Sequence, residues 1–366
     1  MANTSVGYTC PNCGGPLSFS PGAAKVTCPY CDTEFETAKI EEIFAKQEKM
    51  AAEAQAAKEA KWHTEGAGGE WSEEEAAAMK AFTCSSCGAE IVSDSNTMAT
   101  ECCYCGNPVM LPSRFNGMLK PDFVIPFKKT KEDAVAQLKE FYKGRWLLPK
   151  AFTAGNRVES IQPMYVPFWL FDSEVTASAE FKAESDTVYE TQDERVTETN
   201  VYRCDRRGKM RFRRIPVDGS NKMDDTYMES IEPYDYGDLK PFSSAYMAGC
   251  LADKYDVDAE AAAPRADERV RKSAVGVLED TVEGYIRREL VNDVINKGEG
   301  SVSYAMAPVW ILTTRYEDKP YTFMMNGQTG KMVGSLPWDK NKANLYWAGS
   351  TAVLTAVFYF LVRMFV

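Results

Sequence analysis

The chain has 366 residues, 45% of them hydrophobic, so it is long enough to bury a sizeable core and to carry small appended modules. Its net charge is −11, and residues 1–110 alone carry seven lysines, no arginine and 16 acidic residues, a balance of −9. Because nucleic-acid binding proteins use Lys and Arg to replace the counterions of the phosphates, this segment argues against a nucleic-acid interface.

The eleven cysteines are expected to be reduced thiols. Disulfide-rich scaffolds are small secreted domains, whereas this chain is large and its first residues, MANTSVGY, lack the basic start and apolar core of a signal peptide. We therefore expect the cysteine-bearing part to be cytoplasmic.

Two copies of one cysteine pattern lie near the start of the chain, each a C-x2-C pair, a 14-residue gap and a second C-x2-C pair. The eight residues are Cys10, Cys13, Cys28, Cys31, Cys84, Cys87, Cys102 and Cys105. One tight turn can aim both sulfurs of a pair at a common point, and Gly14 and Gly88 permit the bend after the first pair of each copy. Four thiolates satisfy Zn2+ and leave no open coordination position. The pattern predicts two structural Zn2+ sites, in zinc ribbons at residues 1–37 and 81–112, whose folding depends on the metal.

Some thiols leave alternatives open. Thiol–disulfide exchange also uses C-x2-C, although redox pairs normally occur singly. Cys103 competes with its neighbour Cys102 as a ligand, and only Cys102 preserves both spacings. Cys204 and Cys250 stand alone, so we interpret them as ordinary core or surface thiols.

A helical acidic linker, residues 38–80, is predicted between the ribbons. Its stretch Ile40–Lys61 is rich in the helix formers Ala, Glu, Lys and Gln, which predicts a solvated spacer helix. Ser72 and Glu75 predict a capping box for a short second helix. The only histidine, His63, lies here without a nucleophile beside it, and we do not expect a catalytic role.

The body, residues 113–337, is predicted to be an antiparallel α+β domain. Its expected elements are a helix from Thr130 to near Gly144, a buried strand Met164–Phe171, a helix starting near Pro264, a strand Met306–Leu312, and a hairpin Tyr321–Met325 with Lys331–Val333. Pro167-Phe-Trp169 and Pro308-Val-Trp310 match in type and in position after a helix. An internal duplication, with halves 120–200 and 260–337, and convergent strand composition both explain the match.

Three motifs in the body carry competing interpretations. Gly327–Lys331 (GQTGK) lacks the spacing of a phosphate loop. The basic segment Arg203–Arg214 fits a solvated strand face, with anionic lipid contact as the alternative. The acidic residues of Asp253–Glu260 lack the glycine of a calcium loop, and helix capping explains them better.

The C-terminal segment 343–366 is predicted to be one transmembrane helix. Leu345–Val362 is an uncharged run of 18 residues, about 27 Å as a helix, which spans a bilayer. Lys340 and Lys342 precede the span and only Arg363 follows it, which favours a cytoplasmic N-terminal side. Small residues at 348, 352 and 356 would allow spans to pack together, so homo-oligomerisation is an alternative left open.

Several stretches resemble a bacterial family of TFIIB-type zinc ribbon-containing membrane proteins, the YdjG-like proteins. Besides the paired ribbons, they are KPDFVIPF at 120–127, YVPFWLFD at 165–172, GCLADKYDVD at 249–258 and NGQTGK at 326–331. The resemblance implies a non-enzymatic protein that is anchored in the cell membrane. It also implies an SPFH-domain (flotillin-like) scaffold as partner and a setting of PspA-type envelope stress.

The sequence thus predicts an α+β multidomain adaptor, single-pass in the membrane, whose zinc ribbons bind a protein partner. Its partners would be proteins and the lipid bilayer, with no nucleic acid. The alternative function is a zinc-ribbon transcription or replication factor that binds nucleic acid, and a thiol-based redox enzyme is a third hypothesis.

Overall fold

The computed structural model describes residues 17, 25–30, 32–40, 42, 45, 61–94, 97, 101–107, 110–113, 115, 118–155, 160–190, 194–223, 225–317 and 319–365. By its internal contacts the chain divides into two compact units. Unit 1 comprises residues 1–61, 173–211 and 271–300, and unit 2 comprises residues 62–172, 212–270 and 301–366. Three long strands continue from one unit into the other.

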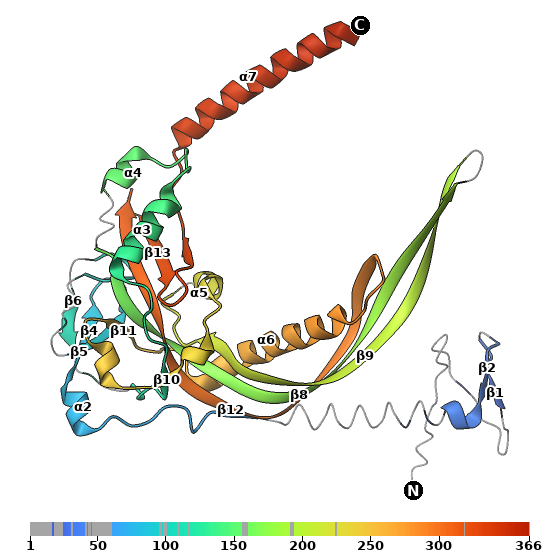
Figure 1. Cartoon of the computed structure of the whole chain (residues 1–366), viewed down its shortest axis with the longest axis horizontal. Helices are drawn as coiled ribbons and strands as arrows, with labels where there is room; N and C mark the ends of the chain where they lie inside the picture. Colours follow the sequence, from blue (N-terminus) through green and yellow to red (C-terminus); the bar gives the residue numbers. More distant parts are fainter. Residues whose placement is uncertain are drawn as a thin grey trace. The chain divides into compact units, whose positions relative to one another are not determined.

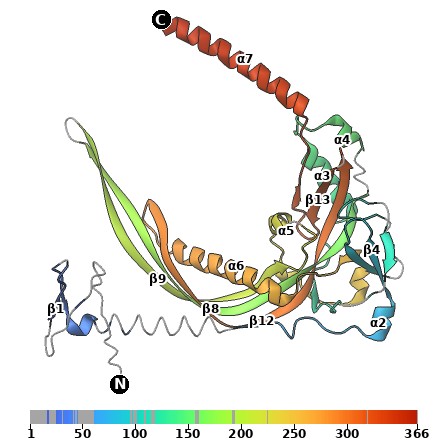
Figure 2. The ribbon, with the colours of Figure 1, turned by 180° about the vertical axis from the view of Figure 1, so that it is seen from behind.

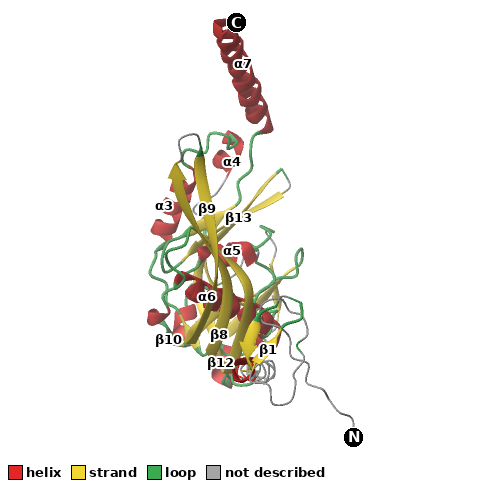
Figure 3. Ribbon diagram, turned by 90° about the vertical axis from the view of Figure 1, so that its right-hand side faces the viewer, coloured by secondary structure: helices red, strands yellow, loops and turns green. Residues whose placement is uncertain are grey.

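The protein is a mixed α+β structure (Figure 1, Figure 3). The strands are β1 (Lys25–Thr27), β2 (Glu34–Glu36), β3 (Trp62–His63), β4 (Met79–Cys84), β5 (Glu90–Asp94), β6 (Met110–Ser113), β7 (Phe123–Val124), β8 (Gln162–Glu190), β9 (Arg195–Asp218), β10 (Lys240–Pro241), β11 (Leu251–Asp253), β12 (Arg287–Tyr316), β13 (Lys319–Asn326) and β14 (Met332–Gly334). The helices are α2 (Glu73–Ala77), α3 (Lys131–Tyr142), α4 (Lys150–Gly155), α5 (Asp225–Ile231), α6 (Ala259–Asp280) and α7 (Lys340–Phe365), with 3-10 turns η2 (Tyr236–Asp238) and η3 (Ser244–Met247).

A large sheet organises the body, with the strand order β10-β7-β12-β8-β11-β5-β4-β6. Strand β9 pairs with β8, and the antiparallel hairpin of β13 and β14 pairs with β12. The central strands are buried on both faces: Phe168, Trp169 and Phe171 of β8 are each at most 2% exposed. This explains why their sequence is continuously apolar instead of alternating.

The two halves of the body exchange strand partners in the centre of the sheet. β7 precedes α3 and β8 in the chain, yet it pairs in parallel with β12, where Ala305 faces Phe123. β11 precedes α6 and β12, yet it pairs in parallel with β8, where Leu251 faces Met164. Each short strand therefore pairs with the long strand that belongs to the other half.

Local signals located several elements correctly. Thr130 caps α3, its hydroxyl accepts from the Asp133 N–H, and the capping box predicted with Ser72 and Glu75 opens α2. The Asn326–Lys331 stretch forms the predicted hairpin turn, since the Asn326 carbonyl accepts from the Gly330 N–H at 2.9 Å.

Three elements differ from the expectation, and so does the strand direction: the body is predicted to be antiparallel, whereas β7 with β12 and β11 with β8 run parallel. Helix α6 begins at Ala259, five residues before the predicted start, because Asp258 accepts a hydrogen bond from the Ala261 N–H at 2.7 Å and so caps the helix earlier. Pro264 lies inside the helix. The predicted strands Met164–Phe171 and Met306–Leu312 are parts of the much longer β8 and β12. The predicted spacer helix Ile40–Lys61 lies mostly outside the described residues.

Candidate metal centre

Four predicted ligands, Cys84, Cys87, Cys102 and Cys105, come together at one edge of the large sheet. All four sulfurs lie within 4.8 Å of one another. The Cys84 and Cys105 sulfurs are 3.7 Å apart, as are those of Cys87 and Cys102. Cys84 and Cys105 are 21 positions apart in the chain. The spacing of the two C-x2-C pairs predicts that their sulfurs meet, and they do.

The two halves of this cluster have the same backbone turn. After the first pair, the Gly88 N–H donates to the Cys84 carbonyl at 2.9 Å, with a φ of +70° at Gly88. After the second pair, the Gly106 N–H donates to the Cys102 carbonyl at 2.9 Å, with a φ of +65° at Gly106. Both turns require the left-handed backbone that glycine adopts without strain.

These turns also aim backbone N–H groups at the sulfurs. Burial acts to raise the pKa of the Cys84 thiol, but hydrogen bonds from the Cys87 and Ser86 backbone, together with those from the Cys87 and Cys105 side chains, lower it to about 6. At Cys102, burial raises the pKa well above the usual range, although the Cys105 and Tyr104 backbone oppose it. N–H groups directed at sulfur stabilise the thiolate form, which is the form that binds a metal.

The cluster has the dimensions of a tetrahedral thiolate site. Zn–S bonds of about 2.3 Å place the sulfurs of a tetrahedral site about 3.8 Å apart. The two measured separations of 3.7 Å agree with this spacing. Four sulfur donors also favour a soft or borderline-soft metal ion over Mg2+ or Ca2+. The four residues are therefore compatible with a metal site.

Cys103, the ambiguous neighbour, lies outside the cluster. It is 5% exposed and its sulfur is 3.7 Å from the Met164 sulfur in the core. Its backbone carbonyl accepts from the Thr313 hydroxyl. Cys102 and Cys103 thus point to different surroundings, and Cys102 is the member of the cluster, as the spacing indicated.

The cysteine segment is continuous with the body of unit 2. β5, which follows the first turn, pairs with β11, where Ser93 faces Leu251. Phe82 and Ile91 of this segment pack in the same hydrophobic cluster as Val166 and Leu170 of β8. The strands of this segment, predicted as a zinc ribbon at residues 81–112, are part of the large sheet.

In the first cysteine segment the structure describes Cys28; the predicted ligands Cys10, Cys13 and Cys31 lie outside the described residues. The Cys28 N–H donates to the Thr33 carbonyl, and the Asp32 N–H donates to the Cys28 carbonyl, both at 3.0 Å. The same two bonds join Cys84 to Ala89 and Gly88 to Cys84. Asp32 has a φ of +54°, so this turn has the left-handed residue at the same position.

The strands around this turn also match those of the second segment. Thr27 pairs with Glu34 between β1 and β2, and Thr83 pairs with Glu90 between β4 and β5. Cys28 is fully buried with Leu17, Val26 and Ile40. The backbone at Cys28 is therefore that of a cysteine turn of the kind seen at Cys84.

Sequence reasoning missed two residues of the second segment. Gly106 provides the second left-handed turn, and the amide of Asn107 lies 3.9 Å from the Cys84 sulfur, within reach of a weak N–H···S bond. The glycine directly after Cys105 repeats the Cys-Gly order of Cys87-Gly88, a signal that could have identified it.

The other single cysteines do not join the cluster. Cys204 is buried on β9, and Cys250 is half-buried. Burial raises the pKa of the Cys250 thiol to about 11. Both fit the interpretation as ordinary thiols. His63 is exposed on β3.

Three basic residues of Arg203–Arg214 bond to neighbours within unit 1. Arg203 pairs with Glu180 of β8 at 2.9 Å, and Arg211 pairs with Glu174 of the same strand. Arg206 donates to the Thr281 hydroxyl at 3.1 Å. The two ion pairs join β9 to β8, and such cross-strand pairs are typical of a solvated strand face.

Helix α7 is long and apolar enough to cross a membrane, from Lys340 to Arg363, and its apolar window is 0% buried. It extends away from the α4 end of unit 2 (Figure 2). The hydroxyls of Thr351 and Thr355 donate to the carbonyls four residues earlier, at 2.8 Å each. The helix therefore satisfies these polar groups internally, as a lipid environment requires.

Comparisons with known proteins give one informative relative. No family model and no solved structure matches the chain. The uncharacterised protein YdjG of Bacillus subtilis (strain 168) is 35% identical over 242 residues, which cover 66% of this chain and 70% of YdjG. The relation to YdjG predicted from the sequence is confirmed, whereas the TFIIB-type ribbon stays a prediction. The chain belongs to the YdjG family.

Proposed function

We propose that this protein is a membrane-anchored zinc adaptor whose two cysteine segments each hold a structural Zn2+ ion. The observation that carries the proposal is the convergence of the four sulfurs at the spacing of a tetrahedral thiolate site. A site with four protein thiolates has no coordination position for a substrate, so the metal stabilises the fold and performs no reaction.

The second ion of the proposal belongs to the first cysteine segment, as a zinc ribbon of the TFIIB type. Its support is the turn at Cys28, whose two backbone bonds repeat those at Cys84. Cys10, Cys13 and Cys31 would complete its ligand set, by their spacing in the sequence.

Helix α7 would anchor the chain in the cell membrane by a single pass, with the N-terminal bulk in the cytoplasm. Its exposed apolar surface supports this, as do Lys340 and Lys342 before the span. The reduced thiols that a metal site requires point to the same compartment.

The adaptor function follows from the combination of anchor and metal-stabilised segment. Residues 1–110 are too acidic for a phosphate backbone, which favours a protein partner. By the family resemblance, that partner is an SPFH-domain scaffold in a PspA-type envelope-stress setting.

Matched variants of the full chain test the proposal in membranes. The wild type, Cys103→Ala, Cys84→Ser and Cys10→Ser are purified after crosslinking, and the recovered proteins are identified by mass spectrometry. We expect the wild type and Cys103→Ala to recover an SPFH-domain protein and the two ligand variants to recover much less. Equal recovery from all four would remove the cysteine segments from the mechanism.

Two further measurements test the membrane anchor and the nucleic-acid alternative. Leu354→Arg places a charge in the apolar span, a cost of about 3 kcal/mol, and should shift the chain out of the membrane fraction. Salt-sensitive retention of the wild type on DNA or RNA would instead support the nucleic-acid alternative.

A further inference from the structure

The loop Gly144–Leu148, between α3 and α4, is bonded to the beginning of α7. The Asp339 N–H donates to the Leu147 carbonyl at 2.8 Å, and the Lys342 ammonium donates to the Leu148 carbonyl at 3.0 Å. The Asp339 carboxylate also caps α7, since it accepts from the Lys342 N–H at 3.1 Å. These bonds fix the position of the loop along the helix axis.

Trp146 of this loop lies at the level where the apolar run of α7 begins. Its ring packs edge-on against Tyr346, with 4.2 Å between ring centroids. Tyr346 is the second residue of the run Leu345–Val362. If α7 spans the bilayer as proposed above, on which this inference rests, Trp146 lies at the boundary between hydrocarbon and headgroups, where Trp and Tyr are enriched.

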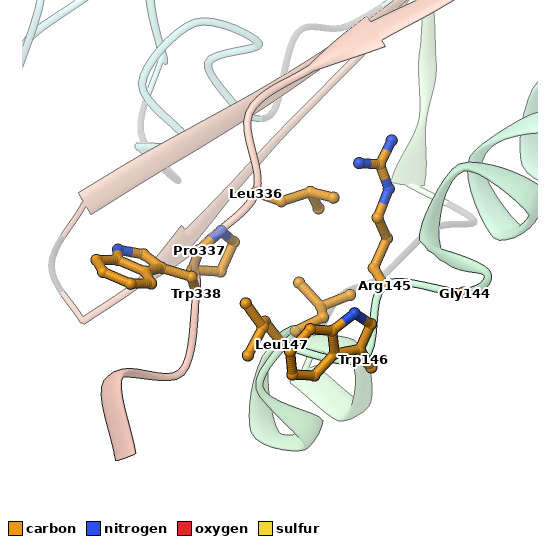
Figure 4. A pocket seen from close by; sticks show the side chains of 8 residues that line it. Gly144, Arg145, Trp146, Leu147, Leu336, Pro337 and Trp338 are labelled. Carbon is orange, nitrogen blue, oxygen red and sulfur yellow. The ribbon is translucent and has the colours of Figure 1, made fainter. Parts of the chain in front are cut away.

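A pocket of about 360 Å³ opens at this level, between the loop and the segment before α7. Figure 4 shows Arg145, Trp146 and Leu147 from the loop on one side and Leu336, Pro337 and Trp338 on the other. Trp146 is 58% exposed and Trp338 is 62% exposed, an unusual amount of open indole surface for a folded protein in water. The volume lies in the range of small-molecule sites.

The charge around the pocket is positive. Arg145 is exposed, and its guanidinium lies 5.3 Å from the centre of the Phe141 ring; within the described part of the chain it has no ion pair. The exposed Lys340 is close in sequence to the pocket. Lys143 and Lys342 add two cations that pair with Glu140 and Asp339. The residues around the pocket therefore carry more positive than negative charge, which favours contact with anionic lipid.

We infer that this pocket binds the headgroup of an anionic phospholipid, with Arg145 at the phosphate and the two indoles in the interfacial layer. The protein would then contact the membrane twice, through the span and through the loop. A headgroup in the pocket would fix the orientation of unit 2 at the membrane surface, which the span alone leaves free to rotate.

The test uses the full chain in mild detergent, titrated with phosphatidylglycerol or with phosphatidylcholine, and bound lipid is counted by native mass spectrometry. Arg145→Gln removes the proposed phosphate ligand from an exposed position. Lys240→Gln is the matched control, because Lys240 is an exposed cation on β10. Trp146→Ala removes one indole, and inorganic phosphate is added as a competitor.

We expect the wild type to bind phosphatidylglycerol in preference to phosphatidylcholine. Arg145→Gln should bind it about fivefold more weakly, since one cation near an anionic surface contributes about that factor, and Lys240→Gln should equal the wild type. Trp146→Ala should weaken the binding of both phosphatidylglycerol and phosphatidylcholine. Equal binding by Arg145→Gln and the wild type, or displacement of the lipid by phosphate alone, would overturn the inference.

Failure of the inference can be distinguished from failure of membrane anchoring. Arg145→Gln retains α7, so it should stay in the membrane fraction as fully as the wild type. A wild type that is absent from membranes contradicts the proposed anchor. A membrane-bound wild type without lipid preference contradicts the inference alone.

Discussion

Trp169 and Trp310 make the same hydrogen bond in the two halves of the body. The Trp169 indole donates to the Val257 carbonyl at 2.8 Å, and the Trp310 indole donates to the Lys129 carbonyl at 3.0 Å. Each acceptor directly precedes the residue that caps a helix, Asp258 for α6 and Thr130 for α3.

A second set of bonds repeats in the same way. The Gly219 N–H donates to the Pro167 carbonyl and the Gly327 N–H donates to the Pro308 carbonyl, at 2.9 and 2.8 Å. The Gly219 carbonyl accepts from residues 256 and 257, and the Gly327 carbonyl accepts from residues 128 and 129. Shared composition alone does not require these matching bonds, so they favour duplication as the origin of the two Pro-x-Trp strands, whose predicted boundaries stay a proposal.

Both tryptophans should therefore matter similarly for stability. Trp169→Phe and Trp310→Phe each leave a partly buried carbonyl without its donor, and such a loss costs about 1–3 kcal/mol. Thermal unfolding should show a lower midpoint for both variants. Trp338→Phe, at an exposed position, is the control and should unfold like the wild type; a shift as large as that of the buried pair would contradict the assignment.

Metal content should separate the two adjacent cysteines. With two ions proposed per chain, Cys102→Ser should reduce the zinc content by one ion, because it removes a ligand of the cluster. Cys103→Ser should retain both, since its sulfur faces Met164. Elemental analysis of the purified chains measures this; loss of zinc from Cys103→Ser with retention in Cys102→Ser would reverse the ligand assignment.

The two glycine turns should control metal affinity. Gly88→Ala and Gly106→Ala force an L side chain into the left-handed region, at a cost of about 1–2 kcal/mol. We expect metal affinity to fall about five- to thirtyfold in competition with a chelating dye. Gly66→Ala, where a Cβ meets nothing within 4 Å, should leave the affinity unchanged.

Stability should depend on pH through Asp253 on β11. Burial raises the pKa of its carboxyl to about 7, and the nearby hydroxyls of Ser220 and Tyr104 oppose this only in part. The folded state then holds a proton that the unfolded chain releases near pH 4, so this contribution to stability is complete below about pH 4 and is lost as the pH rises through about 7.

Asp253→Asn should remove this dependence. Between pH 6 and pH 8 the wild type should lose about 1.4 kcal/mol more unfolding free energy than the variant, measured by denaturant titration with zinc in excess. Asp280→Asn, at an exposed position on α6, should follow the wild type. Parallel curves for the wild type and Asp253→Asn would show that the carboxyl is ionised throughout this range.

Local features of the sequence located much of this structure. The caps at Thr130 and Ser72 and the turn at Asn326 depend on residues within four positions of each other. The cysteine spacing also identified the four members of the cluster. Each C-x2-C turn is local, and the two turns are separated by only 14 residues.

Features that depend on distant partners were not predictable. The length of β8 and its pairing with β11 follow from strands about 90 residues away, which no local pattern encodes. The direction of the Cys103 side chain depends on Met164, and the contact of Trp146 with Tyr346 joins residues 200 positions apart. By contrast, the capping role predicted for the acidic residues of Asp253–Glu260 is local, and Asp258 has it at the start of α6.

The crossed pairing of β7 with β12 and of β11 with β8 bears on how this protein can be dissected. A fragment that ends between the halves would leave one edge of its long strand, β8 or β12, without a pairing partner. Its short strand would also lack the long strand with which it pairs in the whole chain. Such fragments should aggregate or stay unfolded when made singly, yet recover soluble structure when both are produced together in one cell. Each half would then supply the strand that completes the sheet of the other.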